Sequence, residues 1–407
     1  MSAAHSSVFV ADATRPATVA RQERGSVPWY IWTGVVAVTS STIGGAWDVS
    51  WHRSIGRDTF WTPAHLMIQA CAVLAAIIGI YLVITATFGK SEKAHELRAS
   101  SVNIFGLYAP LGVFLAGWGG IAMLTSAPFD NWWHNAYGLD VKIVSPPHTL
   151  LILGIRAVGL GILFLILAAM NRAYQHSSEA GEAASFKSLQ LLLLYVGGLS
   201  VGGNMFFIQE YTWDVVLHQT SAYIALAIAV PVLFAMYSQA TRFRWAATTT
   251  AAVYTFFIIA EILILPLFPA QPKLGPVFNP VTHLVPAKFP VLILVPAIAL
   301  DLVWDRMKTW KFWQVAIVSG VIFVAVMTVV EWNFAKFLLS KASENRFFGT
   351  TYFDYNASPT GIDRMRVFWH PAYGVGLAKG LTIASLCAMV STWIGLCFGR
   401  WMRGVQR

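Results

Sequence analysis

The sequence predicts an all-α protein, a polytopic bundle of transmembrane helices with about ten spans. Of its 407 residues, 57% are hydrophobic and only 12% are charged, and the mean hydropathy is +0.60. Soluble domains carry about a quarter charged residues, so this composition excludes a water-soluble globular protein. It also excludes a disordered chain and, despite a net charge of +9, a nucleic-acid binder of the usual kind. The lipid bilayer is therefore the partner that we expect first.

Ten apolar stretches approach or exceed the about 20 residues with which a helix crosses the hydrocarbon core. Residues 1–28 precede them, are polar and lack the apolar core of a signal peptide, which predicts a cytoplasmic N-terminal tail. The ten expected spans are 29–46, 63–88, 103–126, 146–172, 187–208, 219–240, 244–268, 289–305, 312–335 and 371–399.

Lys and Arg are unevenly shared between the two sides that these spans define. The segments on the side of the two termini carry 16 of them, and the opposite loops carry 10, half of which fall in the long segment 336–370. Short cytoplasmic loops are enriched in Lys and Arg. We therefore expect both termini in the cytoplasm, in a bacterial-type cytoplasmic membrane or its equivalent.

Seven of the ten histidines fall on the outer side, in loops or in the first turn of the following helix. Imidazole is the commonest protein metal ligand, so this one-sided distribution indicates a metal-binding face. Three of the seven follow an Asp by four residues, an interval that places two side chains on one face of a helical turn. The seven are His52, His65, His134, His148, His218, His283 and His370, and the three Asp residues are Asp48, Asp130 and Asp214.

The first two Asp–His pairs belong to a longer unit that occurs twice. His52 is followed after 13 residues by His65 in Thr-Pro-Ala-His, and His134 is followed after 14 by His148 in Ser-Pro-Pro-His. In each copy the Thr or Ser is a predicted N-cap and the Pro a first helical residue. The positive end of that helix favours a neutral imidazole, which is the form that binds metal. The duplicated span–loop–span unit thus predicts two metal sites, Asp48/His52/His65 and Asp130/His134/His148.

The metal is not specified by this pattern alone. Two His and one carboxylate suit copper(II), zinc or non-haem iron. The three Cys lie in apolar runs and form no thiolate metal motif. A plainer interpretation of each set is a hydrogen-bonded Asp–His couple beside interfacial Trp residues.

The segment from Trp51 to His65, WHRSIGRDTFWTPAH, resembles the metal-site segment of the C subunit of the particulate methane and ammonia monooxygenases. The Asp-x3-His-x12-His spacing and the core Arg-Asp-Thr-x-x-Thr-Pro-x-His match without a gap. The second set resembles a later segment of that subunit, with Asp130 standing where the family has Asn. The resemblance covers residues 29–172, a four-helix unit, and leaves about six further helices in residues 173–407.

This resemblance implies copper at both sets, Asp48/His52/His65 and Asp130/His134/His148. It further implies oxidation of a small apolar substrate with dioxygen at the outer membrane face, in a complex with other membrane subunits or an electron donor. Two alternatives stay open. One is a copper-handling or assembly protein without turnover, and the other is a structural subunit of a larger membrane complex.

Weaker candidates lie in the remaining loops. The loop 209–218 has three interpretations: a third ion site, a set of side chains that supports the ligands of the first two sites, or an interfacial loop that binds no ion. The residues concerned are Glu210, Asp214 and His218. Asn279-Pro280 before His283 resembles another N-cap and helix start. The outer loop 336–370 is interpreted as a lid or as a docking surface. Arg156 and Glu261 fall within spans and predict either an ion pair or a proton path.

Overall fold

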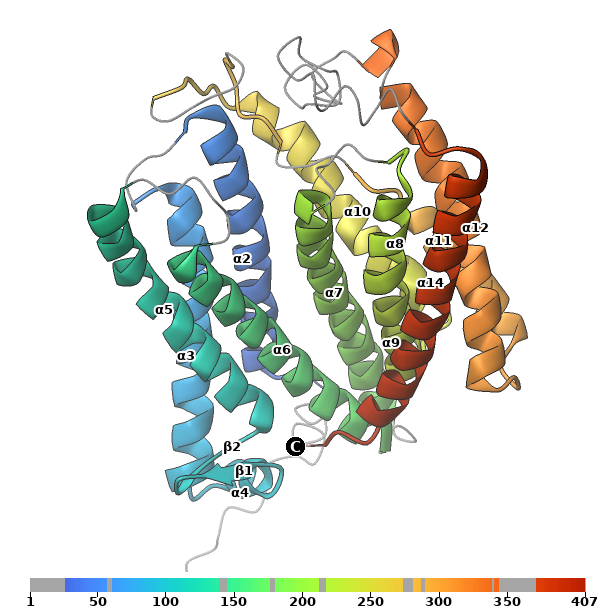
Figure 1. The fold of residues 1–407 in the computed structure, drawn as a ribbon. Helices are drawn as coiled ribbons and strands as arrows, with labels where there is room; N and C mark the ends of the chain where they lie inside the picture. Colours follow the sequence, from blue (N-terminus) through green and yellow to red (C-terminus); the bar gives the residue numbers. More distant parts are fainter. Residues whose placement is uncertain are drawn as a thin grey trace, which may run out of the picture.

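The computed structural model describes residues 26–56, 61–138, 145–175, 180–211, 217–273, 281–286, 290–338, 340–343 and 371–406. The described chain is almost entirely helical, as the sequence predicts, with one short antiparallel hairpin (Figure 1). The N-terminal elements are α2 (Trp29–Ser54), α3 (Pro63–Phe88), α4 (Glu92–Ala99), β1 (Val102–Ile104), β2 (Leu107–Ala109), α5 (Leu111–Tyr137) and α6 (Pro146–Gln175). They are followed by α7 (Ala180–Tyr211), α8 (Thr220–Ala229), α9 (Pro231–Thr241), α10 (Ala246–Ile264), η1 (Leu265–Leu267), α11 (Leu294–Arg306), α12 (Phe312–Leu338), η2 (Lys341–Ser343) and α14 (Gly374–Met402).

Eight helices in the described part of the chain are long and apolar enough to cross a membrane. They confirm a polytopic integral membrane protein. The eight are α3, α5, α6, α7, α8 together with α9, α10, α12 and α14.

The two other expected spans differ from these eight. The helix α2 has the length of a span but is less apolar, because Ser, Thr, Gly and Trp interrupt its aliphatic residues. The helix α11 has 13 residues, about 20 Å at 1.5 Å per residue, which is shorter than the hydrocarbon core. The expected span 103–126 also begins later, at Leu111, because the residues before it form the β1–β2 hairpin.

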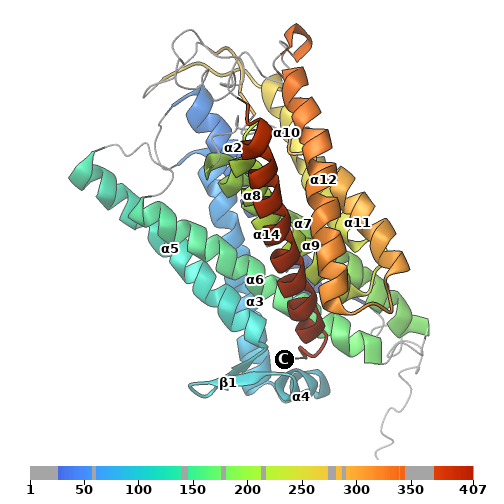
Figure 2. The ribbon, with the colours of Figure 1, turned by 45° about the vertical axis from the view of Figure 1, so that its right-hand side comes forward.

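The helices form two groups that lie side by side (Figures 1 and 2). The first group is α2, α3, α5 and α6, and the second contains α8 to α14. The long helix α7 joins them, since Leu193 belongs to the apolar core of the first group and Val201 and Met205 to that of the second. The unit 29–172 that the sequence delimits is thus packed along one side of a second bundle.

Small residues allow α5 and α6 to pack with their backbones in contact. A Cβ atom added at Gly112 would lie 2.3 Å from the carbonyl oxygen of Gly161, and one added at Gly119 would lie 2.6 Å from that of Gly154. Such approaches are typical of glycine-lined crossings in membranes, where packing replaces the hydrophobic effect between helices. The crossing fixes how the end of α5 meets the start of α6.

The helix that spans 220–241 is broken at Pro231, which has no N–H to donate. Ser391 of α14 forms hydrogen bonds with the backbone on both sides of this break. Its hydroxyl donates to the carbonyl oxygen of Ile228 at 2.7 Å and accepts from the N–H of Val232 at 2.9 Å. A membrane interior has no water to satisfy these groups, so the hydroxyl couples α14 to both α8 and α9.

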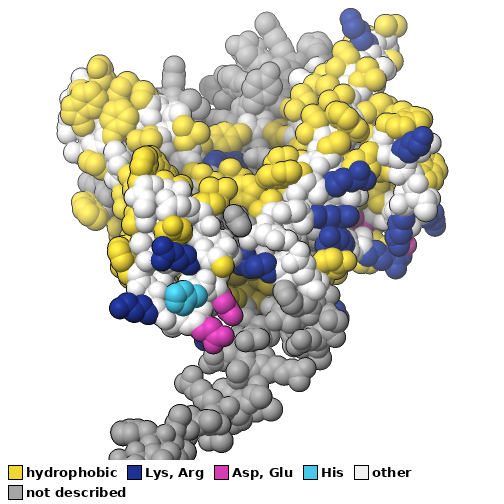
Figure 3. Space-filling view, turned by 90° about the horizontal axis from the view of Figure 1, so that it is seen from below, with side chains coloured by type: hydrophobic (Ala, Val, Ile, Leu, Met, Phe, Trp, Pro, Cys, Tyr) yellow, Lys and Arg dark blue, Asp and Glu magenta, His cyan; other side chains and the backbone are white. Residues whose placement is uncertain are grey.

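The end of the molecule that carries α4, the hairpin and the C-terminus bears many Lys and Arg side chains. Figure 3 shows this end from below, with basic side chains around apolar surfaces. The helix α3 descends toward this end before α4, so that α3 starts, and α2 ends, at the opposite end (Figure 1). The Asp/His sets therefore lie at the end away from the basic face.

We predict that Gly161→Ala lowers the free energy of unfolding by about 1–3 kcal/mol, because the added methyl group meets backbone atoms of α5. Its Cβ would lie 2.4 Å from the carbonyl oxygen of Gly112. Gly159→Ala is the matched control on the same helix, since no atom lies within 4 Å of its added Cβ. Unfolding in mixed micelles measures both, and equal stabilities for the two variants would contradict the close crossing.

We predict that Ser391→Ala destabilises the protein by about 1–3 kcal/mol, the cost of leaving buried polar groups unsatisfied. The control is Ser385→Ala on the same helix, because the Ser385 hydroxyl donates only to Leu381 one turn earlier. The same unfolding measurement applies. A loss in the control as large as that in Ser391→Ala would show that the break at Pro231 does not depend on the hydroxyl.

Candidate metal centre

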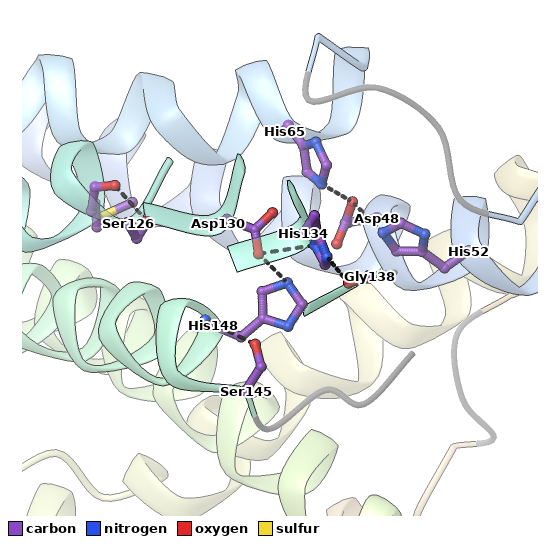
Figure 4. A network of polar contacts seen from close by, with 10 residues as sticks. Asp48, His52, His65, Ser126, Asp130, His134, Gly138, Ser145 and His148 are labelled. Carbon is purple, nitrogen blue, oxygen red and sulfur yellow. Dashed lines mark hydrogen bonds and ion pairs between the residues drawn. The ribbon is translucent and has the colours of Figure 1, made fainter. Parts of the chain in front are cut away.

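The first predicted set assembles from two helix ends. Asp48 and His52 lie on the last turns of α2, and His65 lies in the first turn of α3 (Figure 4). The Nε2 atoms of His65 and His52 lie 3.0 and 3.5 Å from the same carboxylate oxygen of Asp48. One ligand atom from each residue lies within 4.8 Å of the other two, which no other group of His, Cys, Asp or Glu achieves in the described chain.

Helix capping places His65 as the sequence predicts. The hydroxyl of Thr62 accepts a hydrogen bond from the backbone N–H of His65 at 3.2 Å, and Pro63 is the first helical residue. Ser145 does the same for the N–H of His148 at 3.4 Å in front of α6. Both imidazoles therefore leave the chain from the third position of a capped helix.

In the second predicted set, between α5 and α6, two imidazoles again approach one carboxylate, but among the described residues its three ligand atoms do not all lie within 4.8 Å of one another. The Nε2 atoms of His134 and His148 lie 3.2 and 3.4 Å from one carboxylate oxygen of Asp130. That oxygen is buried and makes no hydrogen bond of acceptable geometry. The Asp130 oxygen therefore has a lone pair available to bind a metal ion, and the two imidazole nitrogens beside it are further metal-binding atoms.

A backbone carbonyl orients His134. The Nδ1 atom of His134 lies 3.2 Å from the carbonyl oxygen of Gly138 (Figure 4). Because a carbonyl only accepts, this contact is a hydrogen bond when Nδ1 carries the hydrogen, and Nε2, on the side of Asp130, is then the nitrogen that faces a metal ion. Contacts of this kind fix the tautomer of metal-binding histidines. Gly138 has φ +82° and ψ −179°, a region that is essentially restricted to glycine.

The two sets face one cavity of about 50 Å³. A cavity needs about 10–15 Å³ for each water molecule, so this one has room for a few atoms of ligand. Both sets contribute polar side chains to its wall, and the larger part of the wall is apolar. The lining residues are Asp48, His65, Ile68, Gln69, Ser126, Ala127, Asp130, Pro147, His148 and Leu151.

The segment after α10 forms hydrogen bonds with the end of α2. The sequence pattern did not indicate this contact. The Ser54 hydroxyl donates to the carbonyl of Ser50 at 2.7 Å and accepts from the N–H of Val285 at 2.8 Å. The N–H of Lys273 donates to the carbonyl of Ile55 at 2.8 Å. An apolar cluster covers the same end, and its members are Trp47, Trp51, Ile55, Leu265, Ala270 and Leu284.

Two weaker candidates are placed away from the cavity. His218 is buried against Trp332, and its Nε2 lies 3.2 Å from the carbonyl oxygen of Trp332. Burial lowers the pKa of His218, an effect that the nearby Lys336 reinforces and the Trp332 carbonyl opposes. His283 forms an isolated bridge with Pro269 and contacts the Thr282 hydroxyl at 2.9 Å. The helix start expected at His283 is therefore wrong.

Other expectations lie outside the described residues. These are Asp214, His370, the side chain of Glu210 and all but the first residues of the loop 336–370. The ion pair between Arg156 and Glu261 does not form. The Arg156 guanidinium instead lies between α6 and α7, 3.5 Å from the Ser200 carbonyl oxygen and 5.5 Å from the Phe207 ring centroid.

Comparisons of the chain with protein-family models, with curated proteins and with solved structures found no match.

We predict that Gly138→Ala lowers the free energy of unfolding by about 1–3 kcal/mol, because a Cβ strains this backbone conformation. The displaced carbonyl also removes the contact of Nδ1 of His134, which changes the ¹⁵N NMR signals of its imidazole. Gly45→Ala in α2 is the control, since its Cβ would meet no atom within 4 Å. An unchanged His134 spectrum in Gly138→Ala would contradict the proposed role of the carbonyl.

Proposed function

We propose that this chain is an integral membrane copper protein, with one ion bound by Asp48, His52 and His65 and a second by Asp130, His134 and His148. The observation that carries the proposal is the convergence of two imidazole Nε2 atoms on one carboxylate oxygen in each set, at 3.0–3.5 Å. Each nitrogen–oxygen pair at this separation can contact the same ion, because metal–ligand bonds to His and Asp are about 2.0–2.2 Å. The first set also has all three ligand atoms within 4.8 Å of one another, whereas in the second the two imidazoles would have to move closer together to bind one ion.

The residues fit a metal ion better than they fit plain ion pairs. The Asp130 oxygen is buried but makes no well-aligned hydrogen bond, although two imidazoles lie close to it. A bound ion would take up its lone pair. Two nitrogens and one oxygen suit copper(II), zinc and iron alike. The resemblance of residues 51–65 to the copper segment of the monooxygenase C subunit is the reason to propose copper.

The proposed reaction class is oxidation of a small apolar substrate with dioxygen. Copper, when bound, supplies one-electron oxidation and reduction and affinity for dioxygen. Three protein ligands leave coordination positions open, and both sets face the one small cavity. Ile68, Ala127 and Leu151 provide apolar walls against which a small hydrocarbon can pack. The substrate would reach this end of the helices from the lipid phase, and electrons would come from a partner subunit or donor.

We also propose that the cavity opens at the outer face of the membrane. Many Lys and Arg side chains lie at the opposite end (Figure 3), and short basic segments mark the cytoplasmic side. A copper-handling role is the second candidate. It is favoured by the exposure of the His52 side chain, 38% of which is accessible, because an accessible ligand allows an ion to exchange with a carrier.

We predict one or two copper ions per chain in protein purified in nanodiscs, measured by elemental analysis together with the copper(II) paramagnetic signal. Asp48→Ala/His52→Ala should remove the ion of the first set, and Asp130→Ala/His134→Ala that of the second. The control is His95→Ala, since His95 is exposed on α4 at the other end. Zinc at the same stoichiometry would exclude the oxidation. No bound metal, or copper content that does not respond to either double variant, would refute the proposal.

A further inference from the structure

We infer that the side-chain oxygen of Gln69 positions a water molecule or hydroxide in the cavity between the two Asp/His/His sets. This inference rests on the proposed metal function and adds a positioning residue to it. Gln69 follows His65 by four residues on α3, so that it lies one turn deeper on the same face. Its side chain lines the same cavity as His65, Asp48 and Asp130.

The orientation of the Gln69 amide is determined by its neighbour on α5. Its Nε2 donates to the backbone carbonyl oxygen of Met123 at 3.4 Å. Because a carbonyl oxygen accepts and cannot donate, the amide nitrogen rather than the amide oxygen faces Met123. The oxygen Oε1 is buried and has no hydrogen-bond partner in the described chain.

The described side chains around the cavity do not supply a donor to this oxygen. The carboxylates of Asp48 and Asp130 are acceptors, and the Nε2 atoms of His65 and His148 face these carboxylates (Figure 4). The Ser126 hydroxyl donates to the Met123 carbonyl at 2.6 Å. The other lining side chains are apolar. A buried acceptor left unsatisfied costs about 1–3 kcal/mol, so a ligand with a hydrogen to donate is favoured here.

The size of the cavity restricts that ligand. About 50 Å³ accommodates only a few water-sized groups. Dioxygen has no hydrogen to donate and would leave the oxygen of Gln69 unsatisfied. Water and hydroxide both donate, and both are ligands that a metal ion with an open position takes. Gln69 therefore favours water at the open coordination positions of the proposed ion. A ligand that has no hydrogen to donate must displace this water.

The test compares Gln69→Leu with wild type in nanodiscs, loaded with copper and exchanged into ²H₂O. We expect equal copper content and loss of the exchangeable-deuteron coupling from the copper(II) electron–nuclear spectrum. We also expect azide, which has no hydrogen to donate, to bind about two- to tenfold more tightly, since the water it displaces has lost one hydrogen bond. Gln69→Glu keeps an acceptor and should restore the deuteron coupling.

The matched control is Gln190→Leu, which removes a buried amide whose Nε2 donates to the Thr241 carbonyl at 2.6 Å, remote from the cavity. It should leave the deuteron coupling and the azide affinity unchanged. If Gln69→Leu does not fold, Gln69→Met provides the same comparison with an unbranched side chain. Copper-loaded Gln69→Leu with a wild-type deuteron coupling would overturn this inference alone, as would selective loss of copper from that variant. Absence of copper from wild type would overturn the metal function and this inference together.

Discussion

The close crossing of α5 and α6 is the packing constraint on which the candidate centre depends. Gly112 faces Gly161, and Gly119 faces Gly154, so that the two backbones touch along several turns. Since helices are stiff, this contact sets the separation of their outer ends, where Asp130 and His148 meet. Larger side chains along the crossing would meet backbone atoms of the facing helix and push the two helices apart.

The same local design serves both sets. A carboxylate and an imidazole come from the last turns of one helix, and the second imidazole comes from the third position of the next helix, behind a hydroxyl cap. The cap satisfies a backbone N–H that would otherwise lack a partner at a helix start. It also fixes the position from which the imidazole leaves the helix. Local chemistry thus places both His65 and His148 beside a carboxylate.

The membrane spans and the two Asp/His/His sets could be predicted from the sequence, because both depend on short-range patterns. Apolar length indicates the spans, and the spacing of Asp, His, Thr and Pro indicates both sets and their caps. The contacts of Ser54 with Val285 and of Gln69 with Met123 join residues far apart in the chain, and no local pattern marks them. The short helix α11 and the hairpin before Leu111 were missed because hydropathy measures polarity and not backbone conformation. His283 was misassigned since Asn-Pro also occurs outside helix starts.

The hydrogen bond from the Val285 N–H to Ser54 makes the end of α2 dependent on a distant part of the chain. The unit of α2 to α6 contains all the proposed ligands, but the last turn of α2 is completed by backbone from the segment after α10. Cutting the chain after α6 would return Ser54 and the Ile55 carbonyl to water, next to the ligand-bearing turn. The segment after α10 therefore supports the turn that carries Asp48 and His52 from behind, although the cavity itself is lined by α2, α3, α5 and α6 alone among the described elements.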